Sequence, residues 1–505
     1  MKGKSKLQIF LLIVALLAIS GYDVSAPLLI LKAFMGTLAG KVVVASVTII
    51  VTVCLANYSY LRSVLRLLKM VYIAKAHDRK YRKGLYSFLD SFEEKVDSDK
   101  NRTVQFVVAE TGEQVTLHNL DILANQVGHW GLSKGLKQQD SVALMLLNTP
   151  DYVALWLGFG KIGVSTALLN TNLTGNAFVH SCEVSLKNSS AKILIVDSDL
   201  KKQLSVDLQK IESLGIEILY WSSNIALESI KHDVVKQSSQ RISRSCRDKV
   251  NESDALLFIF TSGTTGLPKA CKISNTRMFL STIPYRVLCD LTPADRIYTV
   301  LPLYHSGGGM LGVGAALMSG ATMVLRKKFS ASNFTSDCLK YKITSFQYIG
   351  ELCRYLTAIP SNEKDSTLTS IRTAYGNGMR PDVWEIFQKR YNVQHIVEFY
   401  GATEGNASLF NCFDKVGALG HIPPLLDPVY PLRILKTDSD DRTKPLRDPT
   451  TGRCIACKAG EVGLLVSQIF SNRKFEGYTD AKATNEKILK NVFKEGDAYF
   501  NTGKR

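Results

Sequence analysis

The sequence predicts an α/β fold from about Thr103 onward, and two observations support that class. Short runs rich in β-branched and aromatic residues (VQFVV, SVALML, KILIVD, ALLFIF, RIYTVL, ATMVL) alternate with stretches of helical period. The composition, 46% hydrophobic and 21% charged, is ordinary for a globular protein. Alternating strands and helices predict mostly parallel sheets covered by helices, and 505 residues leave room for three or more units.

The N-terminal part of the chain differs from the rest in hydropathy and charge. Two long apolar runs lie at residues 7–31 and 42–56, before the α/β region. Residues 1–83 hold 13 Lys or Arg against two Asp, so they carry +11 of the formal charge of +17. A nucleic-acid binder more often carries its basic residues through the folded domain. Basic residues that flank apolar segments favour a membrane surface rich in anionic lipid, so membrane lipid is the expected partner and nucleic acid is not.

We expect residues 1–60 to form a membrane anchor, and three arrangements fit the two apolar runs. They are a two-helix hairpin, one anchor with an embedded segment, and a cleaved signal followed by one span. The second run is shorter than the ~20 residues of a typical spanning helix. Lysines before the first run and basic residues after the second would both be cytosolic in a hairpin. This charge distribution favours the hairpin or a re-entrant anchor.

A basic helix is expected at residues 61–83. Within Leu61–Lys75, one helical face would hold apolar side chains and the other most of the Arg and Lys residues. The apolar set is Leu61, Val64, Leu65, Leu68 and Tyr72. A surface helix that covers the folded domain would show the same pattern. Next to two membrane segments, we interpret it as a helix that lies in the membrane interface.

Ten cysteines are scattered between Cys54 and Cys457 without the density of a disulfide scaffold. The C-x-x-C pair of Cys454 and Cys457 has no second pair, so it does not predict a zinc site. Reduced thiols that face the cytosol are the simplest interpretation.

The sharpest functional signal is a loop that follows a buried strand, at residues 259–269. Glycines let backbone N–H groups approach a polyphosphate, hydroxyls add donors, and a lysine adds a positive charge. The loop lacks the Gly-Lys pair of a Walker A motif. The candidate nucleotide-binding residues are Thr261, Ser262, Gly263, Thr264, Thr265, Gly266, Pro268 and Lys269.

This loop, TSGTTGLPK, resembles the phosphate-loop signature of the adenylate-forming (AMP-binding) superfamily, and YGATEG at residues 400–405 resembles the second signature. Five further stretches narrow the resemblance to the fatty acid transport protein and very-long-chain acyl-CoA synthetase branch. They are LPLYHSGGG (301–309), RKKFSAS (326–332), QYIGELCRYL (347–356), GNGMRP (376–381) and EFYGATEGN (398–406). The resemblance covers residues 84–503, which are expected to form the large AMP-binding domain.

The resemblance implies a large domain of two α/β subdomains and a β-barrel-like subdomain. It also implies roles for single residues. The loop would hold the β- and γ-phosphates of ATP, Tyr400 would stack beside adenine, and Thr403 would contact the α-phosphate. Glu404 would hold Mg²⁺, a metal that prefers oxygen ligands. Lys269, Thr403 and Glu404 are the candidate catalytic residues. The other nucleotide-binding candidates are Gly376, Asn377, Gly378, Gly401 and Ala402.

Tyr304 and His305 match the segment that borders the carboxylate end of the family's acyl tunnel. His305 is either part of the wall or an orienting group, because a lone histidine is often structural. The tunnel itself would lie near residues 310–318 and 352–356, but such helices are equally typical of a core. Adenylation needs no general base, since it depends on positioning and on charge neutralisation.

The implied reaction is the activation of a long- or very-long-chain fatty acid. Fatty acid and ATP would give acyl-AMP and pyrophosphate, and coenzyme A would then release AMP. Coupled to a membrane anchor, this chemistry would trap incoming fatty acids as polar thioesters. The endoplasmic reticulum, the plasma membrane and the peroxisome all suit the family, with the catalytic domain in the cytosol, and homo-oligomers are compatible with it.

The C-terminal end departs from the family's pattern. In the family the Thr-Gly pair is followed by an aspartate that binds ribose and then by a small C-terminal domain. Here Lys504 follows Gly503, so residues 504–505 are expected to be an aberrant end, from a short isoform or a gene-model error. Without that aspartate and that domain, the activity of this chain is doubtful. The alternatives are a non-catalytic fatty acid- or ATP-binding membrane protein that assists uptake, and an adenylating ligase for another acid.

Overall fold

The computed structural model describes most of the chain after residue 57. The described residues are 58–82, 87–187, 189–190, 192–222, 224, 227–262, 266–411, 413–422, 430–438, 441, 444–470 and 475–503. Two compact units are present, Met1–Lys69 and Met70–Arg505. The expected membrane anchor falls almost wholly outside the described residues and stays a prediction. Of the helices in the described part, none is long and apolar enough to cross a membrane.

The six-stranded sheet of the second unit has the order β6-β5-β3-β4-β7-β8. All neighbouring strands are parallel except the hairpin of β7 and β8. Strand β3 is buried along its whole length, as expected for an apolar run covered on both faces. The strands are β3 (Ser141–Met145), β4 (Ser165–Leu168), β5 (Ile193–Asp197), β6 (Glu217–Trp221), β7 (Ala255–Ser262) and β8 (Pro268–Ser274).

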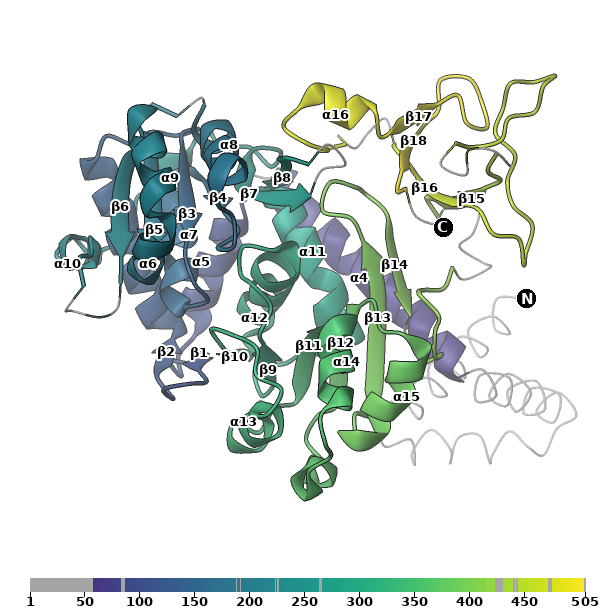
Figure 1. Cartoon of the computed structure of the whole chain (residues 1–505), viewed down its shortest axis with the longest axis horizontal. Helices are drawn as coiled ribbons and strands as arrows, with labels where there is room; N and C mark the ends of the chain where they lie inside the picture. The colour runs from purple at the N-terminus through teal and green to yellow at the C-terminus, as the bar shows by residue number, and fades with distance from the viewer. Residues whose placement is uncertain are drawn as a thin grey trace, which may run out of the picture. The chain divides into compact units, whose positions relative to one another are not determined.

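The eight-stranded sheet has the order β14-β13-β12-β11-β9-β10-β1-β2 (Figure 1). Its six central strands are parallel, and the two edge strands β2 and β14 are antiparallel. The strands are β1 (Val104–Val108), β2 (Gln114–Thr116), β9 (Arg296–Thr299), β10 (Thr322–Leu325), β11 (Ser345–Ile349), β12 (Thr373–Asn377), β13 (His395–Gly401) and β14 (Ser408–Asn411).

A third sheet among the described residues has four antiparallel strands in the order β15-β16-β18-β17. They are β15 (Leu432–Leu435), β16 (Leu464–Gln468), β17 (Ile488–Lys490) and β18 (Ala498–Asn501). The predicted α/β class is therefore confirmed. The sheets are mixed, because the two large ones are mostly parallel and the third is antiparallel. The finer division into two α/β subdomains and a barrel-like one stays a prediction.

Helices cover the two large sheets, and side chains that cap their first turns mark several helix starts. Ser87 and Asp90 form a capping box at α5, and Thr149 with Pro150 begins α7. The longer helices are α5 (Phe88–Ser98), α6 (Leu117–Ser133), α7 (Pro150–Lys161), α8 (Gly175–Leu186), α9 (Lys201–Ser213), α11 (Asn275–Leu288), α14 (Gly350–Ala358) and α15 (Pro381–Arg390). The shorter ones are α10 (Lys231–Val234), α12 (Val313–Ser319), α13 (Phe334–Lys340) and α16 (Ala481–Asn485).

One hydrophobic core joins the two large sheets. It includes Leu144 of β3 and Met323 of β10, with Trp156 of α7 and Leu317 of α12 between them. All four side chains are completely buried, and they belong to one hydrophobic cluster. Because the two sheets share this core, the loops at their carboxyl ends can build one site.

Helix α4 (Tyr58–Arg82) contains the basic helix expected at residues 61–83. Leu65, Leu68 and Tyr72 of the predicted apolar face are exposed, and so is Val71. Further along the helix, His77 is buried and stacks on Phe279 of α11 with ring centroids 3.8 Å apart. Burial lowers the pKa of His77 to about 4, so this docking contact is made by a neutral imidazole.

Candidate active site

The predicted site residues follow the carboxyl ends of parallel strands in the eight-stranded sheet. Tyr304 and His305 follow β9, Gly376–Gly378 ends β12, and Tyr400 lies at the end of β13. The carboxyl ends of parallel strands lie at one edge of a sheet, and ligands of open α/β sheets bind there. Three segments far apart in the sequence are thus placed at one edge (Figure 1).

The β7–β8 hairpin presents the phosphate-loop candidates. Thr261 pairs with Lys269 and Ser262 pairs with Pro268, so both flanks of the loop are held by sheet hydrogen bonds. Gly266 has φ of +90°, a backbone conformation that glycine adopts without strain. Gly263, Thr264 and Thr265 lie outside the described residues, and their expected contacts stay predictions.

The Tyr400–Gly405 segment is held by contacts from two directions. The hydroxyls of Thr403 and Ser306 are 3.1 Å apart, which brings the second signature to the segment after β9. Arg277 of α11 donates to the backbone oxygens of Ala402 and Gly405, at 3.2 and 2.5 Å. The backbone around Thr403 is therefore fixed before any ligand binds, which is the preorganisation that phosphate recognition needs.

Glu398 of β13 organises the loop that follows β12. Its carboxylate accepts hydrogen bonds from the N–H groups of Gly378 and Met379, at 2.5 and 3.1 Å, and from the Tyr348 hydroxyl at 2.6 Å. Burial raises the pKa of Glu398, and these donors oppose the rise. A Cβ on Gly376 would collide with Tyr348, so strand packing alone already requires glycine there.

Tyr304 and His305 lie at the start of an irregular turn. The Tyr304 hydroxyl accepts a hydrogen bond from Asn172 at 3.4 Å. His305 Nδ1 accepts from the Gly307 N–H at 3.3 Å and caps the π-helix of residues 306–312. Such π-helical turns occur often at functional sites. The acyl tunnel was expected near residues 310–318 and 352–356. These segments contribute Met310, Leu352 and other buried side chains to the hydrophobic cores.

Lys269, Tyr478 and Glu404 meet at the junction of the hairpin and the second signature. Lys269 Nζ lies 5.6 Å from the centroid of the Tyr478 ring. Burial raises the pKa of Tyr478, and the charge of nearby Glu404 raises it further. Lys269 thus lies opposite Thr261 in the hairpin and faces the ring of Tyr478, whose pKa responds to the charge of Glu404.

The residues around Glu404 fit a magnesium ion better than a transition metal. No group of three His, Cys, Asp or Glu side chains that could hold a metal is found within the described residues. Mg²⁺ usually binds through one or two carboxylates together with substrate phosphates and water. The half-buried carboxylate of Glu404, in the segment that follows β13, fits that requirement.

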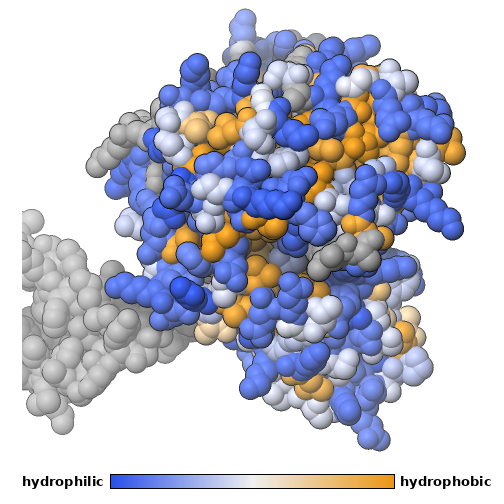
Figure 2. All heavy atoms as spheres, turned by 90° about the vertical axis from the view of Figure 1, so that its left-hand side faces the viewer, coloured by the Kyte–Doolittle hydropathy of each residue, from blue (hydrophilic) through white to orange (hydrophobic). Residues whose placement is uncertain are grey.

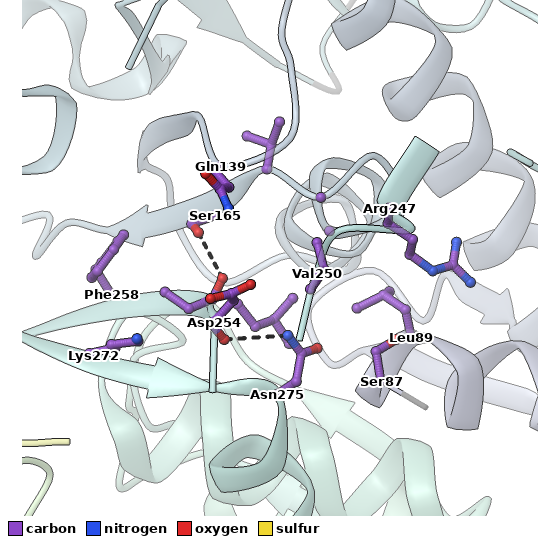
Figure 3. A pocket seen from close by; sticks show the side chains of 15 residues that line it. Ser87, Leu89, Gln139, Ser165, Arg247, Val250, Asp254, Phe258, Lys272 and Asn275 are labelled. Atoms are coloured by element: carbon purple, nitrogen blue, oxygen red, sulfur yellow. Dashed lines mark hydrogen bonds between the residues drawn. The ribbon is translucent and has the colours of Figure 1, made fainter. Parts of the chain in front are cut away.

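A cavity of about 370 Å³ lies elsewhere, at the amino ends of β4 and β7 (Figure 3). Two of its polar lining groups have protein partners. Ser165 donates to the Ala255 oxygen at 2.7 Å, and Arg247 pairs with Glu93 at 2.6 Å. Since parallel sheets bind ligands at their carboxyl ends, this cavity is separate from the candidate site.

The sequence motifs did not assign a role to Glu398, Arg277 or Tyr478. Glu398 carried a usable signal, because a carboxylate in the middle of the strand HIVEFYG must be buried and paired. Arg277 and Tyr478 carried none, since Arg277 contacts Ala402 and Tyr478 pairs with Cys271, both of which are distant in the sequence.

Comparisons with known proteins agree with this geometry. The AMP-binding enzyme family matches residues 92–456. The human long-chain fatty acid transport protein 1 is 40% identical over 407 residues, which are 79% of this chain and 61% of that protein. The rat long-chain fatty acid transport protein 2 is 39% identical over 398 residues, 77% of this chain and 63% of that protein. This chain therefore spans about three fifths of the length of these relatives.

Solved structures share the fold. The N-terminal domain of FACL13 from Mycobacterium tuberculosis aligns with a TM-score of 0.64 at 18% identity, and covers 83% of this chain and 96% of that domain. ATP-bound MatB from Rhodopseudomonas palustris aligns with a TM-score of 0.64 at 18% identity, over 82% of this chain and 75% of MatB. At this identity the two structures support the fold alone.

Proposed function

On the premise that the chain belongs to the AMP-binding enzyme family, in the branch of the long-chain fatty acid transport proteins, we propose that it activates long- and very-long-chain fatty acids. The carboxylate of the fatty acid attacks the α-phosphorus of ATP, which forms acyl-AMP and releases pyrophosphate. The thiol of coenzyme A then attacks the acyl carbon, which forms acyl-CoA and releases AMP and a proton.

In this proposal the β7–β8 hairpin binds the phosphates. Thr261 and Ser262 supply hydroxyl donors, Gly266 and Pro268 shape the turn, and Lys269 supplies positive charge. The undescribed residues Gly263, Thr264 and Thr265 would complete the loop. The support is geometric: a hairpin closed by sheet hydrogen bonds presents these donors at the carboxyl end of β7.

The second signature and the loop after β12 bind the nucleoside side. Tyr400 stacks beside adenine, while Gly376–Gly378, Gly401 and Ala402 leave space for the base against the backbone. Thr403 contacts the α-phosphate. Its hydroxyl is already held by Ser306, and Arg277 holds the neighbouring backbone, so Thr403 acts from a fixed position.

Glu404 would hold Mg²⁺, which neutralises phosphate charge when it is bound. The protein's own contribution is to keep that carboxylate oriented beside Lys269. Tyr304 and His305 would border the acyl carboxylate, where His305 also fixes the turn at Gly307. No general base is required, because the carboxylate is already ionised and the rate gain comes from positioning.

We also infer that the chain works at a membrane surface and couples activation to fatty acid uptake. Helix α4 exposes Leu65, Leu68, Val71 and Tyr72 among its basic residues, a pattern that suits an interface with anionic lipid. On the face of the molecule that Figure 2 shows, apolar side chains are interspersed with polar ones. A cytosolic catalytic domain at the endoplasmic reticulum, plasma membrane or peroxisome fits this role, and so does a homo-oligomer.

The observation that carries the proposal is the way the second signature is held: the Thr403 hydroxyl lies 3.1 Å from that of Ser306, and Arg277 donates to the backbone oxygens of Ala402 and Gly405. The test is pyrophosphate release by the 505-residue chain in detergent, with palmitate or a very-long-chain acid, with and without coenzyme A. A version that carries a family-type C-terminal domain is assayed in parallel. Fatty acid-dependent release by either version supports the proposal. Fatty acid binding without turnover in both would favour a non-catalytic uptake protein.

A further inference from the structure

The segment that carries Tyr304 and His305 follows β9 and folds back on itself. Residues 306–312 form a π-helix that packs closely against the chain leading into it. A Cβ on Gly309 would collide with the backbone oxygen of Leu303, so the two arms of this turn are fixed against each other. The position of the whole turn in the molecule therefore depends on the groups that hold its two arms.

A buried asparagine, Asn148, holds the first arm. It follows β3 of the six-stranded sheet, and its side chain is 7% exposed. Asn148 Nδ2 donates to the backbone oxygens of Leu301 at 3.0 Å and Arg326 at 3.3 Å. Asn148 Oδ1 accepts from the N–H of Leu303 at 2.9 Å. Because Leu303 directly precedes Tyr304, this amide fixes the backbone beside the residues proposed to border the fatty acid.

A second buried amide, Gln347 of β11, holds the other arm and is 1% exposed. Its Oε1 accepts from the Thr299 hydroxyl at 2.8 Å, and its Nε2 donates to the Gly307 oxygen at 2.5 Å. A Cβ on Gly312 would collide with the Gln347 side chain, so the π-helix lies directly on this amide. The turn is thus fastened to the six-stranded sheet by Asn148 and to the eight-stranded sheet by Gln347.

The arm that Gln347 holds also reaches the nucleotide side of the site. Gly307 directly follows Ser306, whose hydroxyl lies 3.1 Å from the hydroxyl of Thr403. Buried amides with satisfied hydrogen bonds specify one geometry, because any other would leave a polar group unpaired. The two amides therefore fix different ends of the turn, Asn148 the acyl end and Gln347 the end beside Thr403.

We propose that Asn148 and Gln347 are positioning residues, one for each substrate. Asn148 places the end of the turn that borders the fatty acid. Gln347 places the end that supports Thr403 against the nucleotide. This inference rests on the proposed function of the site, and neither amide belongs to the two nucleotide signatures.

The experiment uses Asn148→Asp and Gln347→Glu in the full chain in detergent. Each substitution keeps the size and an acceptor oxygen of the side chain, and it removes the N–H groups that donate to backbone oxygens. Dissociation constants are measured with a fluorescent long-chain fatty acid and, separately, with a fluorescent ATP analogue and MgCl₂. The detergent concentration is held constant, and unfolding midpoints are measured alongside.

Two other buried amides that bind backbone groups provide matched controls. Asn275 accepts from the Phe88 N–H and donates to the Asp254 oxygen, both at 3.4 Å. Gln105 of β1 donates to the Ala321 oxygen at 2.8 Å. The partners of both amides lie outside the turn. Asn275→Asp and Gln105→Glu should therefore lower the unfolding midpoint and leave both dissociation constants within about twofold of the parent.

The two positioning variants should give opposite patterns. Asn148→Asp should weaken fatty acid binding about tenfold and binding of the ATP analogue by no more than about twofold, and Gln347→Glu should do the reverse. Ser306→Ala removes a half-buried hydroxyl outside the core and tests the nucleotide end without altering either amide. It should weaken binding of the analogue alone, by about threefold, and Gln347→Glu should add less in that background than in the parent.

Equal losses for both ligands in each amide variant, unchanged binding in either variant, or losses of the same size in the matched controls would overturn the inference. So would unchanged binding of the analogue in Ser306→Ala. Failure of an amide variant to fold while its control folds would also overturn it, because that amide would then serve the fold alone. Failure of the unmodified chain to bind the fatty acid or the analogue would instead overturn the proposed function, and this inference with it.

Discussion

Lys269 and Lys272 lie on the same strand, β8, yet their surroundings differ in kind. Lys269 is opposite Thr261 at the carboxyl end of β7 and faces the ring of Tyr478. Lys272 is opposite Phe258, three positions further along, and lines the cavity at the amino end of the sheet. Ser165 and Arg247, which also line this cavity, are paired with protein groups. Strand direction and available donors, rather than hollow volume, thus distinguish the site from the cavity.

The largest expected effect comes from removing the charge of Lys269. Lys269→Met should lower kcat/KM for ATP about a hundredfold, because a positioned cation no longer meets the developing charge on the phosphates. Lys272→Met, three residues away on the same strand, should stay within about twofold of the parent. Steady-state kinetics with palmitate measures both. Equal losses of kcat/KM in the two variants would contradict the account, because they would show that both ends of the hairpin act on ATP alike.

The buried ion pairs next to the cavity should contribute to the stability of the fold and not to catalysis. Lys161 is fully buried and pairs with Glu93 at 2.6 Å and Asp121 at 2.9 Å. Lys161→Met removes the buried cation that the two carboxylates share and leaves Glu93 with Arg247 and Asp121 with the more distant Arg241, which should cost about 3–5 kcal/mol of unfolding free energy in a denaturant titration.

Lys134 provides the control for this experiment. It forms an exposed pair with Glu217 at 3.2 Å, so Lys134→Met should cost less than about 1 kcal/mol. Where Lys161→Met remains folded, its KM for ATP should match that of the parent. A raised KM in the folded variant would link the buried charges to the site.

A smaller effect is expected from Glu398, which shapes the site without contacting phosphate. Glu398→Gln keeps the size of the side chain but weakens the charge-assisted bonds to Gly378 and Met379. We expect the KM for ATP to rise about fivefold. Glu385 is exposed on α15, and Glu385→Gln should be silent in the same assay. An unchanged KM in Glu398→Gln would show that the loop after β12 does not bind the nucleotide.

The smallest effect is expected from narrowing the cavity. Val250 is half-buried and lines it, so Val250→Leu adds one methylene to the hollow (Figure 3). Stability should change by less than about 1.5 kcal/mol, and the KM values for ATP and palmitate should stay within about twofold. A selective rise in either KM would make the cavity a second substrate site.

Local sequence patterns predicted much of the fold and part of the site. Alternating apolar runs indicated the strands, since burial on both faces gives a parallel strand its composition. The buried run followed by glycines and hydroxyls indicated β7 and the loop after it, but not that β8 pairs back on β7 as a hairpin. The contacts of Arg277 and Tyr478 were beyond reach, because they depend on how distant segments dock and leave no periodic trace. The π-helix after His305 was also missed, since short turns of this kind have no strong local pattern.

The most direct test asks which lysine of β8 lies under bound nucleotide. The full chain is treated with an acetylating reagent in the presence and absence of MgATP, and acetylation of Lys269 and Lys272 is quantified by mass spectrometry. MgATP should protect Lys269 several-fold and leave Lys272 unchanged, whether or not the chain completes its reaction. Protection of Lys272 with no protection of Lys269 would place the nucleotide at the amino end of the sheet and contradict the account.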